Sequence, residues 1–187
     1  MMTLHTIEPE VGNLHGQFSR DLPPILTIDP GDTVRYRTLD AGWNVTKPSG
    51  QARDRSQWHV FPDRDPERDQ GHALNGPIAI RDAKPGMMLM VHIDVVEPDG
   101  WGWNIGVDWW ATRHEPDEQD PFEYFYWDID KTMNTARNRL GQVVPIRPFM
   151  GVLEMPPDEA GWHSTGPPRA CGGNIEWHQR CTRAAAA

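Results

Sequence analysis

A polar pair near the C-terminus, Asn174 and Glu176, carries the clearest chemical signal in this sequence. The two residues follow Gly172 and Gly173 and flank Ile175, so in an extended strand both point to one face and Ile175 points to the other. A side-chain amide and a carboxylate on one face can polarise a carbonyl and position a water molecule, or bind a metal. A solvated polar face is the alternative, and the pattern alone leaves both open.

The eight histidines form no closed metal-binding motif, because the sequence has no H-E-x-x-H and no paired C-x-x-C. His15 and His72 stand out, since each lies beside a glycine that would let backbone or a ligand approach the imidazole closely. Turn geometry explains these glycines equally well. Solvent exposure is the prediction for five others, His5, His59, His92, His114 and His163.

Nucleophilic catalysis is not indicated. Ser19 and Ser164 lack a nucleophile elbow, and neither Cys171 nor Cys181 has an obvious base beside it, so we expect both thiols to be free. The nine tryptophans favour a filled core or an oligomer interface, with a ligand-stacking platform as the alternative.

The charge balance excludes some classes of partner. Eighteen Lys and Arg against 27 Asp and Glu give a net charge of -9, which opposes binding to phosphate backbones or anionic lipid. No stretch reaches the roughly 20 apolar residues of a membrane span, and the N-terminus lacks the pattern of a signal peptide. We therefore expect a cytoplasmic protein that binds neither nucleic acid nor membrane.

These residues must be positioned by a mainly β fold. Eighteen prolines and 17 glycines break up helices and favour short strands joined by turns. Alternating or apolar runs predict strands, the clearest being residues 25–37 around an Asp-Pro-Gly-Asp turn, 78–80, 87–96, 122–129, 143–146 and 150–153. Residues 131–139 are predicted to form one or two helical turns, and the charged residues 53–70 and 112–120 are predicted to be exposed loops. At 187 residues, a single domain over 1–187 is the simplest organisation.

Several motifs together resemble the acetamidase/formamidase family. They occur in the family's order over nearly the whole chain: residues 16–24 with the strand and turn at 28–34, Gly-His-Ala-Leu-Asn-Gly-Pro-Ile at 71–78, Arg-Pro-Phe-Met-Gly-Val at 147–152, and Pro-Pro-Arg at 167–169 leading to Gly-Gly-Asn-Ile-Glu at 172–176.

The resemblance implies a sandwich-like, largely β fold that hydrolyses short aliphatic amides such as formamide and acetamide to carboxylate and ammonia. It implies an acidic and histidine-bearing site, often with a divalent metal, for which zinc is the expected ion. Residue by residue, Asn174 matches the motif's Asn and serves as a polarising donor, and Glu176 serves as base or metal ligand. His72 is the expected substrate contact or second ligand, and Phe149 an apolar wall. A small-molecule amide and a homo-oligomer are the expected partners.

Two departures from the family pattern bear on activity. Glu176 occupies the position where the family usually has Asp, and one extra methylene moves the carboxylate by about a bond length, where roughly 1 Å matters to catalysis. Family members also continue beyond the Gly-Gly-Asn block into a Gly-Asp-x-His-Ala segment that this chain lacks. We therefore expect the N-terminal portion of the family's domain, with the C-terminal part absent.

Two other function classes stay open. A catalytically inactive binding or assembly module with the same β architecture is the main alternative, and hydrolysis of acetamide by the purified chain would argue against it. A cupin-like metal oxygenase or isomerase would need a tighter histidine cluster than the sequence shows.

Overall fold

Strands are the only regular elements in the part of the chain that the structure describes. The structure is a computed structural model, and it describes residues 2–48, 58–107 and 122–174. Fifteen short strands in that part form six small sheets, and no helix there is long and apolar enough to cross a membrane. The prediction of a mainly β fold with little helix is confirmed.

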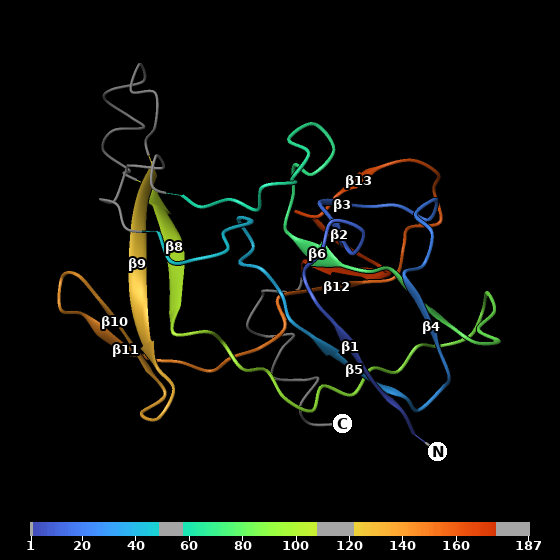
Figure 1. Cartoon of the computed structure of the whole chain (residues 1–187), viewed down its shortest axis with the longest axis horizontal. Helices are drawn as coiled ribbons and strands as arrows, with labels where there is room; N and C mark the ends of the chain where they lie inside the picture. Colours follow the sequence, from blue (N-terminus) through green and yellow to red (C-terminus); the bar gives the residue numbers. More distant parts are fainter. Residues whose placement is uncertain (1, 49–57, 108–121, 175–187) are drawn as a thin grey trace. The chain divides into compact units, whose positions relative to one another are not determined.

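Two units divide the chain, and each is described separately. Unit 1 comprises Met1–Trp43, Val60–Asp94 and Phe149–Ala187, and unit 2 comprises Asn44–His59 and Val95–Pro148. Unit 2 is one antiparallel sheet in the order β11-β10-β9-β8 (Figure 1). Its strands are β8 (Trp101–Val107), β9 (Phe122–Asp130), β10 (Thr135–Asn138) and β11 (Val143–Pro145).

Aromatic residues build the core of unit 2. The predicted aromatic strand is confirmed as β9, in which Tyr126 lies opposite Trp103 of β8. Tyr124 is fully buried, and its ring centroid lies 5.5 Å from that of Trp58 and 5.9 Å from that of Trp103. Trp58 donates a 2.9 Å hydrogen bond from Nε1 to the hydroxyl of Tyr126. These tryptophans therefore fill a core, as the composition favoured.

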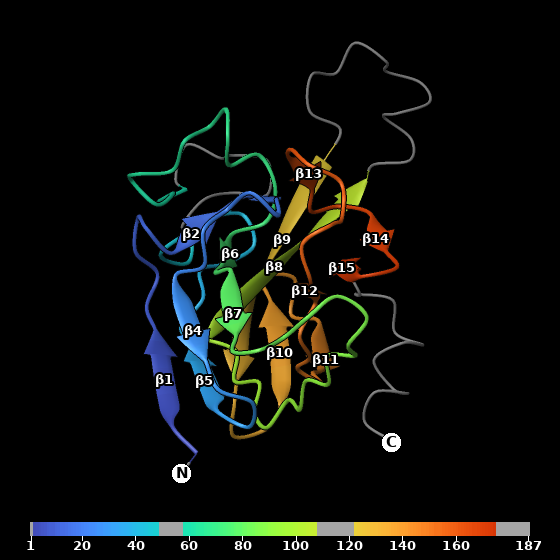
Figure 2. The ribbon, with the colours of Figure 1, turned by 90° about the vertical axis from the view of Figure 1, so that its right-hand side faces the viewer.

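Unit 1 is assembled from short strands that pair over long distances in the sequence (Figure 2). Two pairs are parallel, β1 (Leu4–Ile7) with β5 (Thr33–Tyr36) and β4 (Leu26–Ile28) with β7 (Ile78–Ile80). Two pairs are antiparallel, β2 (Leu14–His15) with β6 (Leu74–Asn75) and β3 (Gln17–Phe18) with β13 (His163–Ser164). A three-stranded sheet contains β12 (Val152–Glu154), β15 (Gly172–Asn174) and β14 (Pro168–Arg169), with β15 in the middle.

The predicted strand over residues 87–96 is wrong. These residues form no strand, and the apolar side chains from Met87 to Val95 are exposed, with fractions between 42% at Leu89 and 94% at Met88. A strand needs a neighbour for its backbone groups and a second layer for its apolar face, and the alternating pattern supplies neither.

The predicted helical turns at residues 131–139 are also wrong. The Asp130 carboxylate accepts hydrogen bonds from the backbone N–H groups of Thr132 and Met133, at 2.9 and 3.0 Å, and closes a turn instead. Asn134 then takes a φ of 50°, and the chain returns as β10. Local side-chain hydrogen bonding of this kind competes directly with a helix.

Two predictions of exposure are wrong as well. Asp69, within the charged residues 53–70, is 1% exposed. His5 lies in β1 rather than in a loop, and its Nε2 is 3.0 Å from the Asp32 carboxylate. Asp69 is bound by the adjacent Arg68 and by the amide of Gly16, 53 residues away, and His5 meets Asp32, 27 residues away. A local pattern does not show such contacts. Cys171 is a free thiol as predicted, whereas Cys181 and residues 112–120 lie outside the described residues.

Candidate active site

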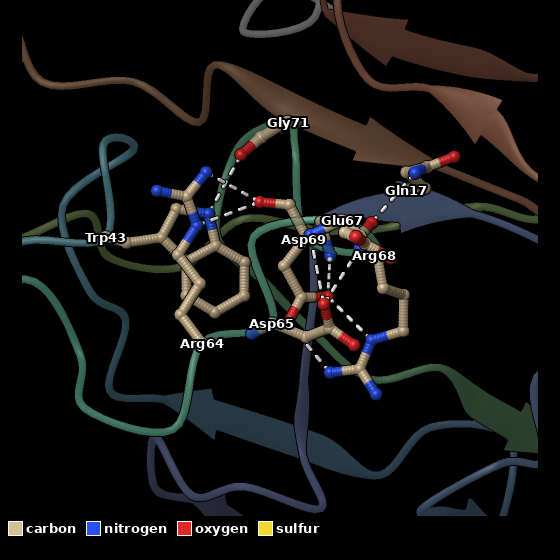
Figure 3. A network of polar contacts seen from close by, with 9 residues as sticks. Gln17, Trp43, Arg64, Asp65, Glu67, Arg68, Asp69 and Gly71 are labelled. Atoms are coloured by element: carbon tan, nitrogen blue, oxygen red, sulfur yellow. Dashed lines mark hydrogen bonds and ion pairs between the residues drawn. The ribbon is translucent and has the colours of Figure 1, made fainter.

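A buried carboxylate organises the loop that leads to His72. Asp69 accepts hydrogen bonds from the backbone N–H groups of Gly16 and Asp65, each at 3.1 Å, and from Nε and Nη2 of Arg68 at 2.9 and 2.7 Å (Figure 3). Burial raises the pKa of Asp69, but the hydrogen bonds from Arg68 and the two amides outweigh it, so the pKa lies below its usual value. Asp69 is therefore a structural anion that ties residues 64–72 to the chain after β2.

The backbone of the same loop is fixed from the other side. The carbonyl of Asp69 accepts from Nε and Nη2 of Arg64, at 2.9 and 2.7 Å, and the guanidinium lies 5.4 Å from the ring centroid of Trp43. The indole N–H of Trp43, a residue 1% exposed, donates a 2.8 Å hydrogen bond to the carbonyl of Gly71 (Figure 3). The position of Gly71 is thus held by a buried aromatic ring.

Two glycines make the closest backbone approach in this region. The N–H of Gly71 donates to the carbonyl of Gly16 at 3.0 Å. A Cβ on Gly16 would lie 2.5 Å from backbone atoms of Asp69, and a Cβ on Gly71 would lie 2.3 Å from Oγ1 of Thr165. Neither position has room for a side chain, which is the physical reason for the glycines that flank His15 and His72 in the sequence.

His72 occupies an insertion between strand pairs. The register pairs His15 with Leu74, whereas the next contact joins Gly16 to Gly71, so the second strand has two extra residues, His72 and Ala73. Insertions of this kind re-aim side chains and are frequent beside active sites. The N–H of Ala73 bonds elsewhere, to the carbonyl of Ala41 at 3.3 Å.

A single buried hydroxyl orients His72. Oγ1 of Thr165, a residue 1% exposed, accepts a 2.9 Å hydrogen bond from the His72 backbone N–H and lies 2.7 Å from Nδ1 of the ring. Because the hydroxyl accepts from the amide, its own proton is available to Nδ1. In that arrangement neutral His72 carries its proton on Nε2, and the part of the chain that the structure describes gives Nε2 no hydrogen bond.

His15 is a second imidazole near the paired glycines. It is 8% exposed, and its Nδ1 is buried with no hydrogen-bond partner in the described structure. Burial, together with the charge of Arg68, lowers the pKa of His15 against the opposing effects of Asp69 and the Gly76 backbone, so the ring is neutral at pH 7. Its flanking glycine was the signal in the sequence, and burial was what the sequence could not show.

A second buried network links the strand of Asn174 to the loop of His72. Arg169 of β14 donates from Nη1 to the Glu154 carboxylate, fully buried in β12, at 3.2 Å, and from Nη2 to the carbonyl of Ser164 at 2.6 Å. Ser164 directly precedes Thr165, which binds His72. Asn174 lies in β15, between the strands of Glu154 and Arg169, and opposite Val152.

Cys171 takes part in the same network. Sγ of Cys171 lies 3.4 Å from the Glu154 carboxylate. Burial and the hydrogen bond to Glu154 raise the pKa of Cys171, so the protonated thiol is favoured.

The other predicted site residues are placed less completely. Phe149 precedes β12 and is 45% exposed, and the described hydrogen bonds of His72 go to Thr165. Glu176 lies outside the described residues, so its meeting with Asn174 and His72 stays a prediction.

The described residues do not fit the expected zinc site. Among residues 2–48, 58–107 and 122–174, no three His, Cys, Asp or Glu side chains gather closely enough to hold a metal ion. Asp69 and Glu154 are each bound to an arginine, and Nδ1 of His72 is engaged by Thr165. A metal would require donors from elsewhere.

Comparison with known proteins decides the family. A sequence model described as the Acetamidase/Formamidase family matches residues 4–166. The chain belongs to this family. It is 32% identical over 150 residues to the formamidase of Methylophilus methylotrophus, a match that covers 76% of this chain and 33% of that protein.

Solved structures show the same fold. The acetamidase of Bacillus halodurans matches with a TM-score of 0.60 and 18% identity, covering 91% of this chain and 52% of that one. The gamma lactamase from Delftia acidovorans matches with a TM-score of 0.59 and 20% identity, covering 91% of this chain and 54% of that one. The chain thus spans about a third of the Methylophilus formamidase and about half of these two structures.

Proposed function

We propose that this chain contributes the His72 side of an amidohydrolase site that cleaves short linear amides, with formamide and acetamide as substrates. Membership of the acetamidase/formamidase family carries the proposal. The fixed orientation of His72 by Thr165 supports it, because catalysis depends on groups that are held in place before the substrate arrives.

In the proposed reaction, Nε2–H of His72 and the side-chain amide of Asn174 donate hydrogen bonds to the substrate carbonyl oxygen. These bonds strengthen as negative charge develops on that oxygen in the tetrahedral transition state. Glu176 accepts a proton from the attacking water and then gives it to the amide nitrogen, so that the carbon–nitrogen bond breaks, ammonia leaves and the carboxylic acid remains. Phe149 restricts the acyl group.

Release of ammonia from formamide and acetamide by the purified chain tests this proposal. Loss of a donor that acts in the transition state lowers kcat by about 100- to 1,000-fold, so His72→Ala and Asn174→Ala should each show such a loss. His92→Ala is the matched control, since the His92 side chain is 88% exposed. No turnover by the chain, either alone or with the rest of a family domain, would favour the inactive binding module.

Variants of Thr165 distinguish a positioning role of its hydroxyl from simple packing. Thr165→Val removes the hydroxyl at nearly constant volume, and it should lower kcat and alter the pH profile of turnover, whereas Thr165→Ser should restore both. Equal losses in the two variants would contradict a role for the hydroxyl.

The homo-oligomer and the cytoplasmic location expected from the sequence remain predictions. Sedimentation of the purified chain measures its oligomeric state.

A further inference from the structure

A tight turn of residues 40–43 contacts the loop that carries His72. The Asp40 carboxylate accepts a 3.0 Å hydrogen bond from the Gly42 N–H, and the Asp40 carbonyl accepts one from the Trp43 N–H at 2.8 Å. Trp43 then takes a φ of 68°, in the left-handed region. Bulky residues adopt this conformation rarely and at a cost in free energy, so the contacts of Trp43 must compensate for it.

The side chain of Trp43 binds the peptide group that joins Gly71 to His72. Its indole N–H donates to the Gly71 carbonyl at 2.8 Å (Figure 3), and Oγ1 of Thr165 accepts from the His72 N–H at 2.9 Å. The carbonyl and the N–H belong to one peptide unit, which is planar. Trp43 and Thr165 therefore hold the two ends of a single plane, and this plane cannot rotate without breaking a hydrogen bond.

The same turn also holds the peptide group on the other side of His72. The Ala73 N–H donates to the carbonyl of Ala41 at 3.3 Å. The two peptide planes that meet at the His72 Cα are thus both bound, and together they set the direction of the Cα–Cβ bond from which the imidazole extends. Residues 72 and 73 are not part of a strand, so contacts with the turn take the place of ladder hydrogen bonds.

A role in packing alone is the simpler alternative for Trp43. The residue is 1% exposed, and the Arg64 guanidinium lies 5.4 Å from the centroid of its ring, so the side chain fills part of the core. A buried indole N–H also needs an acceptor. Packing does not explain, however, why that acceptor and the contact from Ala41 lie on the two sides of one residue, His72.

We propose that Trp43 is a positioning residue for the amide hydrolysis, which holds the backbone of His72 so that Nε2–H points to the substrate carbonyl oxygen. The inference rests on the proposed function of His72, and Trp43 itself touches neither the substrate nor the reacting atoms. Thr165 orients the imidazole ring, whereas Trp43 fixes the backbone that carries the ring. A displacement of about 1 Å can slow a catalysed step by about 100-fold, so a loosened backbone at His72 should lower kcat more than it weakens substrate binding.

Removal of the indole N–H tests the proposal. Trp43→Phe keeps a buried aromatic ring but leaves the Gly71 carbonyl without this donor. In formamide hydrolysis by the full chain, we expect kcat to fall at least about tenfold and KM to change less than about twofold. Trp162→Phe makes the same chemical change at a residue 52% exposed and should leave both constants nearly unchanged. Equal kcat values for the unaltered chain and Trp43→Phe would overturn the proposal.

A second replacement at Trp43 excludes an effect of lost packing. In β-(3-benzothienyl)alanine, sulfur takes the place of the indole N–H in a ring of nearly the same shape. The same loss of kcat is expected, with an unchanged circular dichroism spectrum. A normal kcat in this variant would show that Trp43 acts through packing, and would count against a positioning role.

Nuclear magnetic resonance of His72 separates this inference from the proposed hydrolysis. In the benzothienyl variant, amide hydrogen exchange at His72 should be at least about tenfold faster, and the imidazole nitrogen shifts should move toward those of a ring that exchanges between its two tautomers. If the unaltered chain is inactive but these signals respond, the hydrolysis is refuted while Trp43 still holds His72. Signals that stay the same would refute the role of Trp43, whether or not the chain is active.

Discussion

The loop of residues 64–72 and the segment of residues 87–94 show that order in unit 1 follows from partners rather than from pattern. The loop has no strand or helix pattern and is rich in charge, yet its Asp69 is 1% exposed and receives four hydrogen bonds. Residues 87–94 have a clear strand pattern, yet among the described residues their hydrogen bonds are only the turn from Met87 to Lys84 and the contact of His92 with Asp94, and Val91 is 48% exposed.

The difference has a simple physical cause. A carboxylate with arginine and amide donors around it needs only its local surroundings, because each hydrogen bond is satisfied within the loop and the chain beside it. An alternating apolar strand is ordered only when another strand and another layer meet it. The sequence pattern of a segment therefore shows which structure it can adopt, and the partners that it meets decide whether it adopts that structure.

Removal of the Asp69 carboxylate should give the largest effect. Asp69→Ala leaves the amides of Gly16 and Asp65 and the guanidinium of Arg68 without their acceptor, and should reduce the free energy of unfolding by about 3 kcal/mol. Urea titration measures it. Asp63→Ala, which removes an exposed carboxylate directly before the loop, is the matched control, and equal midpoints for the two variants would show that the network does not order the loop.

A methyl group at Gly71 should have the next largest effect. Gly71→Ala places Cβ 2.3 Å from Oγ1 of Thr165 and 2.4 Å from the carbonyl of Gly16, so the chain must shift, at a cost of about 2 kcal/mol. The His72 ring should move with it, which nuclear magnetic resonance of the imidazole would detect. At Gly12 an added Cβ would have no atom within 4 Å, so Gly12→Ala should leave the free energy of unfolding nearly unchanged. An equally unchanged stability for Gly71→Ala would mean that Gly16 and Gly71 do not approach each other closely.

Acid should weaken the loop region through His15. Burial lowers the pKa of His15 below its ordinary 6.5, so the unfolded chain binds the proton more tightly than the folded one. The stability linked to His15 is therefore complete above about pH 6.5 and is lost as the pH falls below it. His15→Leu should reduce the difference in urea midpoint between pH 7.5 and pH 5.5, and parallel profiles for the two proteins would indicate that His15 is not buried.

Substitution within residues 87–94 should give the smallest effect. Val91→Thr keeps a β-branched shape at a side chain already 48% exposed, so the free energy of unfolding of the chain alone should change by less than about 0.5 kcal/mol. Thermal unfolding followed by circular dichroism measures it. A loss comparable to that of Asp69→Ala would show that the segment is already packed and would remove the contrast between the two regions.

Much of the strand content was predictable, because turns and alternation are local signals. The Asp-Pro-Gly-Asp turn correctly separates β4 from β5, and the aromatic run predicts β9. What could not be predicted is pairing, since β4 bonds to β7 and β5 to β1 rather than to each other. Two-residue strands such as β2 and β13 carry too few side chains for any pattern.

The buried part of the site could be predicted only where a glycine stands beside the residue in the sequence. His72 and His15 were singled out by their neighbouring glycines, and the structure explains those glycines by the close approach of two backbones. Thr165 was not found, because it lies 93 residues from the imidazole it orients and a lone threonine has no distinctive context. Asp69 was predicted to be exposed, because a charged pattern does not show that Arg68 folds over its neighbour or that the distant amide of Gly16 approaches.

The order of strands in the two units has a consequence for how the chain folds. In unit 2 each strand pairs with the next along the sequence, from β8 to β11, so its hairpins can form early at a small loop-closure cost. Unit 1 must join β3 to β13, residues 17–18 to residues 163–164, before the segment containing Thr165 is held in place. During synthesis on the ribosome, the contact that orients His72 therefore forms only after nearly all of the chain has emerged.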